Sequence, residues 1–284
     1  MGALRCQTVP CEIIVIDSSS SDETAEVARA HRAKIIVIDR KNFDHGGTRN
    51  LGVRSSAGNP IVFMTQDVMP ADERVVENLV ESLELRDVAL CYGRQKARPD
   101  ANPVETFARR FNYPEQGFVR SQDDTASFGL RTFFCSNVCS AVKRREFEAV
   151  GGFPERIIMN EDMLLAAKML RAGYKVVYEP SAVVYHSHNY SLLEQFKRYF
   201  DIGAVLKQSG LAAAAGRAEG EGMRYLREQM AYLVREKEWL WLPYALAQAL
   251  VKYSGFRLGF LENLMPRHLK VYLSMNAGFW VRRS

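Results

Sequence analysis

Short apolar runs alternate with helix-like segments over the first part of the chain. Residues 11–17 and 34–39 are β-branched runs that each end in an aspartate, and the helical pattern between them completes a βαβ unit. A third apolar run begins at Ile61 and is expected to be a buried parallel strand that carries Asp67 at its carboxyl end. We therefore predict an α/β fold in which Asp17 and Asp67 lie close together on one edge of a parallel sheet.

Asp67 is the first candidate for chemistry. Ligands of open α/β sheets bind outside the carboxyl ends of the strands, so a carboxylate there is suited to hold a metal ion and, through it, a phosphate. The alternative is that Asp67 only begins a turn or caps the helix expected over residues 71–85.

Residues 45–50, His-Gly-Gly-Thr-Arg-Asn, form the most unusual polar segment of the chain. We expect a loop over 42–47 followed by a helix over 48–57. The two glycines would free the backbone to approach a ligand, Thr48 would cap the helix, and Arg49 would offer a bidentate fork to a phosphate. The alternative is a tight turn with a surface arginine.

A second acidic site lies at Glu161 and Asp162, where an amphipathic helix over 162–173 is expected to begin. Acids are also common in a first helical turn because they complement the helix dipole, so charge placement alone is the competing explanation. His186 and His188 follow a predicted strand. Alternate residues of an extended segment point to opposite faces, so we expect at most one of these histidines to join a given site.

The composition changes in the last third of the chain. A helix is expected over 191–205, and the residues beyond it are helical in pattern and rich in Leu, Tyr and Trp, with prolines and glycines that divide them into short pieces. We predict a catalytic domain over 1–205 and a helical region over 206–284. That region either packs on the domain as an appendage or lies on a membrane surface.

Composition and charge exclude several classes of protein. With 47% apolar and 25% charged residues, the 284-residue chain can bury a full core. A net charge of +5 suits an anionic substrate or a membrane surface, but no stripe of Lys and Arg interleaved with aromatic residues indicates a nucleic-acid partner. The five cysteines are odd in number and lack zinc spacing, which is typical of reduced thiols. No apolar run reaches the ~20 residues of a membrane span and no signal-peptide core is present, so we expect a cytoplasmic protein, free or peripheral on the inner face of the plasma membrane.

The elements in this order resemble the inverting, nucleotide-sugar-dependent glycosyltransferases of the GT-A fold, glycosyltransferase family 2. Residues 43–50 are similar to the signature of bacterial rhamnosyltransferases, and Thr65-Gln66-Asp67 resembles a variant of the family's metal-binding acidic triplet. The resemblance covers roughly residues 11–205 and extends weakly to the tail at 273–276 and Trp280. It implies a Rossmann-like, mostly parallel sheet flanked by helices, with a C-terminal helical appendage.

The resemblance also implies residue roles. Asp162, with Glu161 beside it, would be the catalytic base, and Asn137 would shape the acceptor pocket. Asp67 and His186 would hold Mg²⁺ or Mn²⁺ on the donor diphosphate. The residues implied in donor binding are Asp17, which would read the pyrimidine, and Arg49, Gln66, Gln195 and Arg198.

Two departures from the family pattern affect these expectations. Thr65 stands where many relatives have an aspartate, so metal affinity is expected to be modest and to depend on the substrate phosphates. The family opens with a strand that ends in a Pro-Thr-Tyr-Asn-like loop, followed by a helix. Here only residues 3–7 correspond to the end of that helix, so the first strand is expected to be absent and its position in the sheet unfilled.

The function that the resemblance implies is transfer of L-rhamnose from dTDP-rhamnose to a glycan or lipid-linked acceptor, with inversion, in surface polysaccharide assembly. A UDP-sugar-dependent transferase of the same fold is one alternative. A non-catalytic, membrane-associated scaffold, whose donor site is lost with the first strand, is another. A Rossmann-type dehydrogenase is disfavoured, because no Gly-x-Gly-x-x-Gly segment follows a strand.

Overall fold

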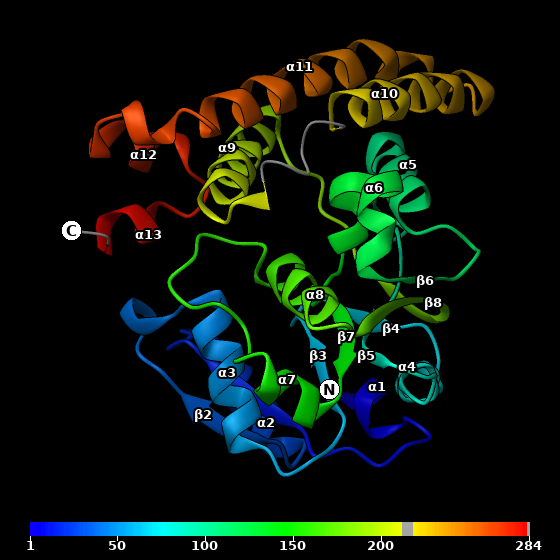
Figure 1. Ribbon diagram of the computed structural model, residues 1–284, viewed down its shortest axis with the longest axis vertical. Helices are drawn as coiled ribbons and strands as arrows, with labels where there is room; N and C mark the ends of the chain where they lie inside the picture. The colour runs from blue at the N-terminus through cyan, green and yellow to red at the C-terminus, as the bar shows by residue number, and fades with distance from the viewer. Residues whose placement is uncertain (212–217, 283–284) are drawn as a thin grey trace.

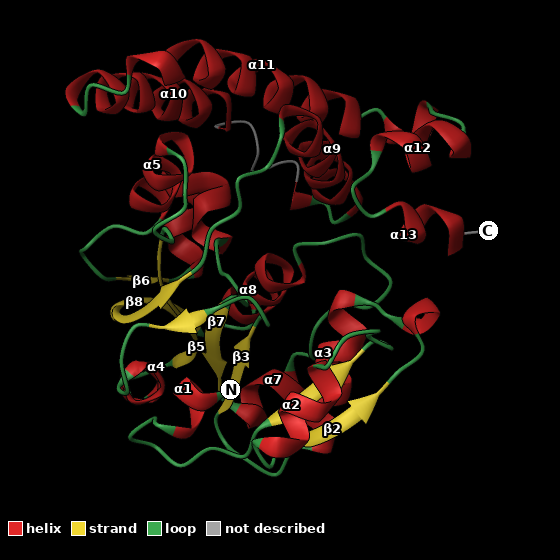
Figure 2. Cartoon of the chain, turned by 180° about the vertical axis from the view of Figure 1, so that it is seen from behind, coloured by secondary structure: helices red, strands yellow, loops and turns green. Residues whose placement is uncertain are grey.

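The computed structural model describes residues 1–211 and 218–282, and its strands form two β-sheets (Figures 1 and 2). A small sheet contains β1 and β2, which pair in parallel. The larger, six-stranded sheet has the order β3-β7-β5-β8-β4, with β6 paired to β8. The strands are β1 Ile14–Asp17, β2 Lys34–Val37, β3 Ile61–Met64, β4 Met69–Pro70, β5 Val88–Lys96, β6 Phe118–Arg120, β7 Cys139–Val142 and β8 Lys175–Tyr185.

The predicted βαβ unit is confirmed, but its place relative to Asp67 is not. Strand β1 belongs to the small sheet, whereas β3 is an edge strand of the larger one and pairs antiparallel with β7. The prediction of a single parallel sheet with Asp17 and Asp67 on one edge is therefore wrong. Strand β3 also ends at Met64. The Val68 N–H donates to the carbonyl of Thr65 and closes a turn, so Asp67 lies between β3 and β4.

The α/β class and the GT-A-type arrangement are confirmed. Parallel pairing joins β1 to β2 and β5 to β8, while the other pairs of the larger sheet are antiparallel. Helix α8 (Glu161–Arg171) and helix α4 (Val75–Leu83) cover opposite faces of this sheet. Adjacent residues of β5 point to these opposite faces, because Leu90 packs in the cluster that contains α8 and Cys91 packs in the cluster that contains α4.

The glycine pair at 46–47 lies inside a helix and not in a ligand-binding loop. Helix α3 (His45–Ser55) begins three residues earlier than expected, because Asp44 is the N-cap and its carboxylate accepts from the Gly47 N–H at 2.7 Å. A Cβ on Gly46 would lie 1.9 Å from the carbonyl oxygen of Pro154. The predictions of a loop over 42–47 and of Thr48 as cap are therefore wrong. The glycines suggested a loop that approaches a ligand, but Gly46 instead allows the backbone at Pro154 to approach the helix.

The segment between β5 and β7 is more ordered than its polar, aperiodic pattern indicates. It holds α5 (Pro103–Asn112), β6, α6 (Thr125–Phe128) and the 3₁₀ helix η3 (Gly129–Phe133). Strand β7 follows this segment at Cys139–Val142.

The described residues beyond 205 are largely helical, as predicted, and helices α10 (Ala218–Arg235) and α11 (Leu242–Gly259) lie along the top of both views (Figures 1 and 2). Helix α11 packs closely on α9, because a Cβ on Gly203, Gly255 or Gly259 would lie 2.1–2.4 Å from a backbone oxygen of the other helix. The division at residue 205 stays a prediction, and α9 runs across it. The remaining helices are α1 Gly2–Arg5, α2 Thr24–Ala30, α7 Arg144–Ala149, α9 Leu192–Gln208, α10 Ala218–Arg235, α11 Leu242–Gly259, α12 Arg267–Leu273 and α13 Ala277–Arg282, with short 3₁₀ turns η1 Arg40–Asn42, η2 Gln122–Asp124, η5 Trp239–Trp241 and η6 Glu262–Leu264.

Two expectations about the chain as a whole can be compared with the structure. All five cysteines are free thiols, as their odd number and spacing predicted. No helix within residues 1–211 or 218–282 is both long enough and apolar enough to span a lipid bilayer.

Candidate active site

Two acidic residues open helix α8, which covers one face of the larger sheet. Asn160 before them adopts the left-handed conformation, with φ +62°, and turns the chain into the helix. Glu161 is buried and Asp162 is half-buried. The pair stays close to the helix N-terminus, where the free N–H groups and the helix dipole favour negative charge.

Glu161 is held by two partners from distant parts of the chain. Its Oε1 lies 3.0 Å from Nη1 of Arg49, which projects from α3, and the side-chain amide of Asn137 donates to the same oxygen at 3.1 Å. The N–H of Asn137 also donates to Oδ2 of Asp162 at 3.1 Å. Asn137 is buried, and its amide oxygen accepts from Ser140 at 3.0 Å. Arg49, Asn137, Glu161 and Asp162 are thus brought together, with Asn137 as the link between the two acids.

The environment of Asp162 favours the protonated carboxyl more than water does. Burial and then the negative charge of Glu161 raise the pKa of Asp162 to about 6, against the opposing effect of the N–H groups of Asn137 and Met163. A carboxylate with a raised pKa, half-open to its surroundings, can accept a proton near neutral pH.

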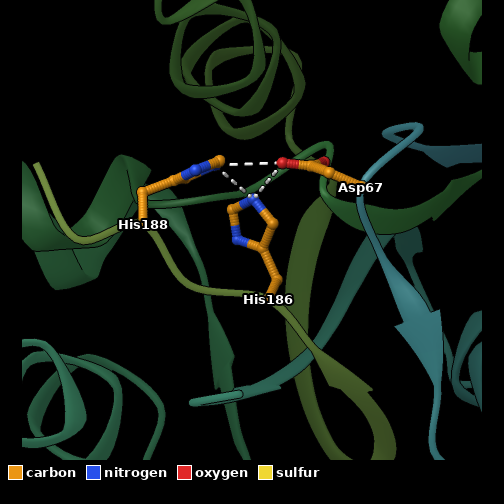
Figure 3. Close-up of side chains that lie close together, drawn as sticks. All are labelled: Asp67, His186 and His188. Atoms are coloured by element: carbon orange, nitrogen blue, oxygen red, sulfur yellow. Dashed lines mark hydrogen bonds and ion pairs between the residues drawn. The ribbon is translucent and has the colours of Figure 1, made fainter. Parts of the chain in front are cut away.

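A second centre is built from Asp67, His186 and His188 (Figure 3). Asp67 lies in the turn after β3, and both histidines lie in the irregular segment after β8. Nε2 of His186 lies 3.2 Å from Oδ2 of Asp67, and Nε2 of His188 lies 3.0 Å from that oxygen and 3.0 Å from Nε2 of His186. The three side chains point toward one another, and their ligand atoms all lie within 4.8 Å.

The donor set of this cluster fits a divalent cation. The imidazole of His186 beside it holds the pKa of Asp67 well below its usual range, so Asp67 is an anion at neutral pH. Burial lowers the pKa of His188 and thereby favours the neutral imidazole, the form that binds metals. One carboxylate and two imidazoles are typical ligands of a transition metal with open coordination positions.

Two adjacent residues, Ser136 and Asn137, lie between the two centres. The side-chain amide of Gln95 donates to Oγ of Ser136 at 2.9 Å, and Gln95 also contacts His186. Asn137, the residue after Ser136, donates hydrogen bonds to both acids. Ser136 and Asn137 therefore connect the Asp67 cluster to Glu161 and Asp162 through adjacent residues.

The other residues expected in donor binding are distributed less closely. Asp17 is buried at the end of β1 in the small sheet, where its carboxylate accepts from the Ser20 N–H at 3.0 Å. Gln66 is exposed beside Asp67. Gln195 is buried in α9, and the guanidinium of Arg198 lies over the ring of Tyr190 at 5.9 Å. Tyr190 in turn stacks on His188, at 5.0 Å between ring centroids, which brings Arg198 toward the Asp67 cluster.

Sequence reasoning missed His188 and the C-terminal contact to α3. His188 joins the cluster because β8 ends at Tyr185, so the alternation of an extended strand no longer applies beyond it. At the other contact, the side chain of Asn276 hydrogen-bonds that of His45, which precedes Arg49 by one turn. The buried carboxylate of Asp201 fixes Asn276 by accepting from its N–H at 3.0 Å. The loose similarity of the tail to relatives was the only signal for this contact.

Solved structures share this fold. A mannosyltransferase, PcManGT from Pyrobaculum calidifontis in complex with GDP-Man and Mn²⁺, superposes with a TM-score of 0.55 at 18% identity, covering 99% of this chain and 81% of that one. TarS residues 1–349 of S. aureus, in complex with UDP-GlcNAc, gives a TM-score of 0.53 at 13% identity, with coverage of 91% and 84%. These similarities show that the chain has a fold of the GT-A class.

Sequence comparison identifies the family. Residues 4–151 match the family described as Glycosyl transferase family 2, to which this chain belongs. It is 41% identical over 284 residues to the O-antigen chain rhamnosyltransferase RfbN of Salmonella typhimurium, covering 99% of this chain and 90% of the relative. It is 38% identical to the O-antigen chain rhamnosyltransferase WbaN of Salmonella anatum, with coverage of 95% and 86%.

Proposed function

We propose that this glycosyltransferase transfers L-rhamnose from dTDP-rhamnose to a glycan or lipid-linked acceptor, with inversion, in the assembly of a surface polysaccharide. The sugar and the pathway rest on the similarity to the two O-antigen chain rhamnosyltransferases. The chemistry rests on one observation, the half-buried Asp162 with its raised pKa beside Glu161 and near the Asp67 cluster.

Asp162 acts as the general base in this proposal. As the acceptor hydroxyl attacks the anomeric carbon, its proton passes to the Asp162 carboxylate and the new carbon–oxygen bond forms. The bond between the anomeric carbon and the diphosphate oxygen breaks on the opposite face, and the leaving nucleoside diphosphate keeps the electron pair. Glu161, neutralised in part by Arg49 at 3.0 Å, holds the pKa of Asp162 high enough for it to accept that proton.

Asp67, His186 and His188 are the residues that would hold a divalent cation. When bound, the cation supplies positive charge to the leaving diphosphate. We propose Mn²⁺ in preference to Mg²⁺, because Mg²⁺ favours oxygen ligands while two of the three ligands here are imidazoles. Arg198, near the cluster through Tyr190, is the proposed second positive charge on the donor.

Calorimetric titration of the full chain with dTDP and with UDP, each with and without Mn²⁺, tests the donor. We expect Mn²⁺-dependent binding that prefers dTDP, and transfer of labelled rhamnose from dTDP-rhamnose to membrane glycolipid. NMR of the product should give the anomer opposite to that of the donor. A preference for UDP would favour the UDP-sugar alternative. Binding of neither nucleotide would favour the non-catalytic scaffold.

We also propose that the outer face of α11 and η6 rests on an anionic lipid surface. Leu246, Leu250 and Tyr253 are exposed and recur at helical spacing along one face of α11, and Leu261 and Leu264 are exposed at and in η6. Leu250 is 69% and Leu264 77% exposed, so packing of this region on the protein does not cover these leucines. Arg257, four residues after Tyr253 on α11, is exposed beside these residues and complements anionic headgroups.

Co-sedimentation with vesicles tests this membrane proposal. The full chain should sediment with vesicles of phosphatidylglycerol and much less with vesicles of phosphatidylcholine. The double variant Leu250→Glu/Leu264→Glu should remain in the supernatant, whereas Leu85→Glu, at an exposed leucine beyond α4, should sediment like the unmodified chain. Equal sedimentation of all three proteins would overturn the proposal.

A further inference from the structure

Gln95 occupies a buried position between a charged pair and the Asp67 cluster. It is 2% exposed on β5. Its Oε1 accepts from Nη1 of Arg109 at 2.7 Å and lies 2.9 Å from Nδ1 of His186. Its Nε2 donates to Oγ of Ser136 at 2.9 Å. None of these contacts reaches the acid pair directly, so Gln95 has a different task from Asn137.

The orientation of the Gln95 amide follows from the chemistry of its neighbour. A guanidinium can only donate hydrogen bonds, so the amide oxygen, and not the amide nitrogen, must face Arg109. Arg109 is itself fixed, because its Nε donates to Oε1 of the buried Glu105 at 2.8 Å. The amide oxygen of Gln95 is therefore held in place by an ion pair between two residues of α5.

The same oxygen determines which nitrogen of His186 carries the proton. An amide oxygen accepts only, so Nδ1 of His186 must donate to it. In a neutral imidazole the other nitrogen then has no proton. Nε2 of His186 thus presents a lone pair to Oδ2 of Asp67 at 3.2 Å and to Nε2 of His188 at 3.0 Å. A lone pair that faces a carboxylate oxygen at this distance is suited to share a cation with it.

We propose that Glu105, Arg109 and Gln95 are positioning residues that lock His186 in the Nδ1–H tautomer, with Nε2 free as a metal ligand. The proposal deepens the proposed metal site and rests on it for its functional meaning. The lock itself exists in the metal-free protein and can be measured there. Partners of this kind fix the orientation and tautomer of ligating histidines.

The tautomer of His186 is the direct test. Long-range ¹H–¹⁵N spectra of the ¹⁵N-histidine-labelled, metal-free full chain, recorded at about pH 8, above the ordinary histidine pKa, distinguish protonated from bare ring nitrogens. The His186 signals are assigned from their loss in His186→Gln. We expect a protonated Nδ1 and a bare Nε2. In Gln95→Leu, which removes the acceptor, Nε2–H should become the main form. A main Nε2–H form in the unmodified chain would overturn the proposal.

Mn²⁺ binding, followed by the electron paramagnetic resonance signal of free Mn²⁺, is the second readout. Gln95→Leu should weaken binding about 10- to 100-fold. Gln95→Glu should restore it to within a few-fold, because a carboxylate oxygen can accept from both Arg109 and His186. Gln229→Leu, which removes another buried glutamine, on α10, should bind Mn²⁺ like the unmodified chain. Unchanged binding in Gln95→Leu would overturn the positioning role. An absence of Mn²⁺ binding in the unmodified chain would refute the metal site and leave the tautomer result to decide the lock.

Discussion

The two aspartates at the centre of the site have opposite electrostatic settings. Asp67 is paired with two imidazoles and its pKa is held well below the usual range, whereas Asp162 is paired with a second carboxylate and its pKa is raised to about 6. Asp67 lies in the turn between β3 and β4, and Asp162 lies in the first turn of α8. At Asp67 the neighbouring imidazole favours the anion, whereas at Asp162 burial and then the charge of Glu161 favour proton exchange near neutral pH.

The difference agrees with the task proposed for each aspartate. A ligand for a cation should be anionic at every physiological pH, and Asp67 meets that condition. A general base should have a pKa near the working pH, and Asp162 meets that one. The connection through Ser136 and Asn137 keeps the two settings adjacent but separate, because Gln95 bonds to one residue and the acids to the other.

The largest effect is expected from removal of the base. Asp162→Asn should lower the turnover number about 10²- to 10⁴-fold, because no carboxylate would accept the acceptor proton. The dissociation constant for dTDP should stay nearly unchanged. The melting temperature should not fall, because Asn137 can still donate to the remaining side-chain oxygen and the repulsion from Glu161 is gone.

A rhamnose transfer assay, calorimetry with dTDP and thermal melting measure these three quantities. Asp123→Asn, at an exposed aspartate, is the matched control and should behave like the unmodified chain. Turnover retained in Asp162→Asn would remove Asp162 as the base. Loss of dTDP binding would assign it to the donor site.

A smaller effect is expected from replacement of His188, which contacts Asp67. His188→Gln should weaken Mn²⁺ binding about 10-fold or more, because the third ligand is lost. Chelation with EDTA should lower transfer by the unmodified chain, and added Mn²⁺ should restore it. Calorimetry with Mn²⁺ is the measurement, with His268→Gln on α12 as the matched surface control. Equal affinities of the two variants would show that His188 is not a ligand.

Local sequence patterns predicted those parts of the fold that depend on neighbours in the chain. The apolar runs gave the β1-α2-β2 unit, and helical spacing gave the start of α8 at the two acids. Both features arise from burial of one face by residues a few positions apart. The place of the acid pair at the start of a helix could therefore be predicted, although the contact of Glu161 with Arg49 of α3 could not. The role of Asp162 as base stays a prediction.

Features set by distant packing were beyond such patterns. Glycine has a low helix propensity, so residues 46–47 looked like a loop, yet both lie in a helix capped by Asp44, where Gly46 allows close contact with the backbone of Pro154. The antiparallel pairing of β3 depends on β7, about 80 residues away. His188 joins the cluster only because the chain leaves the sheet after Tyr185. The alternation of side chains along a strand does not predict where the strand ends.

The pH profile offers a finer way to separate the two aspartates. Transfer should fall as the pH drops through about 6, because Asp162 then gains its proton, while Asp67 with its lowered pKa stays ionised. In Glu161→Gln the charge that helps raise the pKa of Asp162 is gone, so the acidic limb should move to lower pH. The dependence of kcat/KM on pH measures this shift.

Glu148→Gln, at an exposed position of α7, is the control for the pH profile and should leave the limb in place. A limb that stays in place in Glu161→Gln would mean that burial alone sets the pKa of Asp162. A limb that moves to higher pH would contradict the arrangement of the two acids.

The smallest effect is expected from a variant that weakens the contacts of the acid pair and leaves the Asp67 cluster intact. Asn137→Ala should lower the free energy of unfolding by about 1–3 kcal/mol, because Ser140 loses its buried partner and Glu161 loses a donor. Urea denaturation measures the loss, and Asn112→Ala, at an exposed asparagine, should change it by less than about 0.5 kcal/mol. Mn²⁺ affinity should be unaffected, because Gln95 bonds to Ser136 and not to Asn137. Weaker Mn²⁺ binding in Asn137→Ala would mean that residues 136–137 transmit changes between the centres, and the two aspartates would then have to be treated as one coupled site.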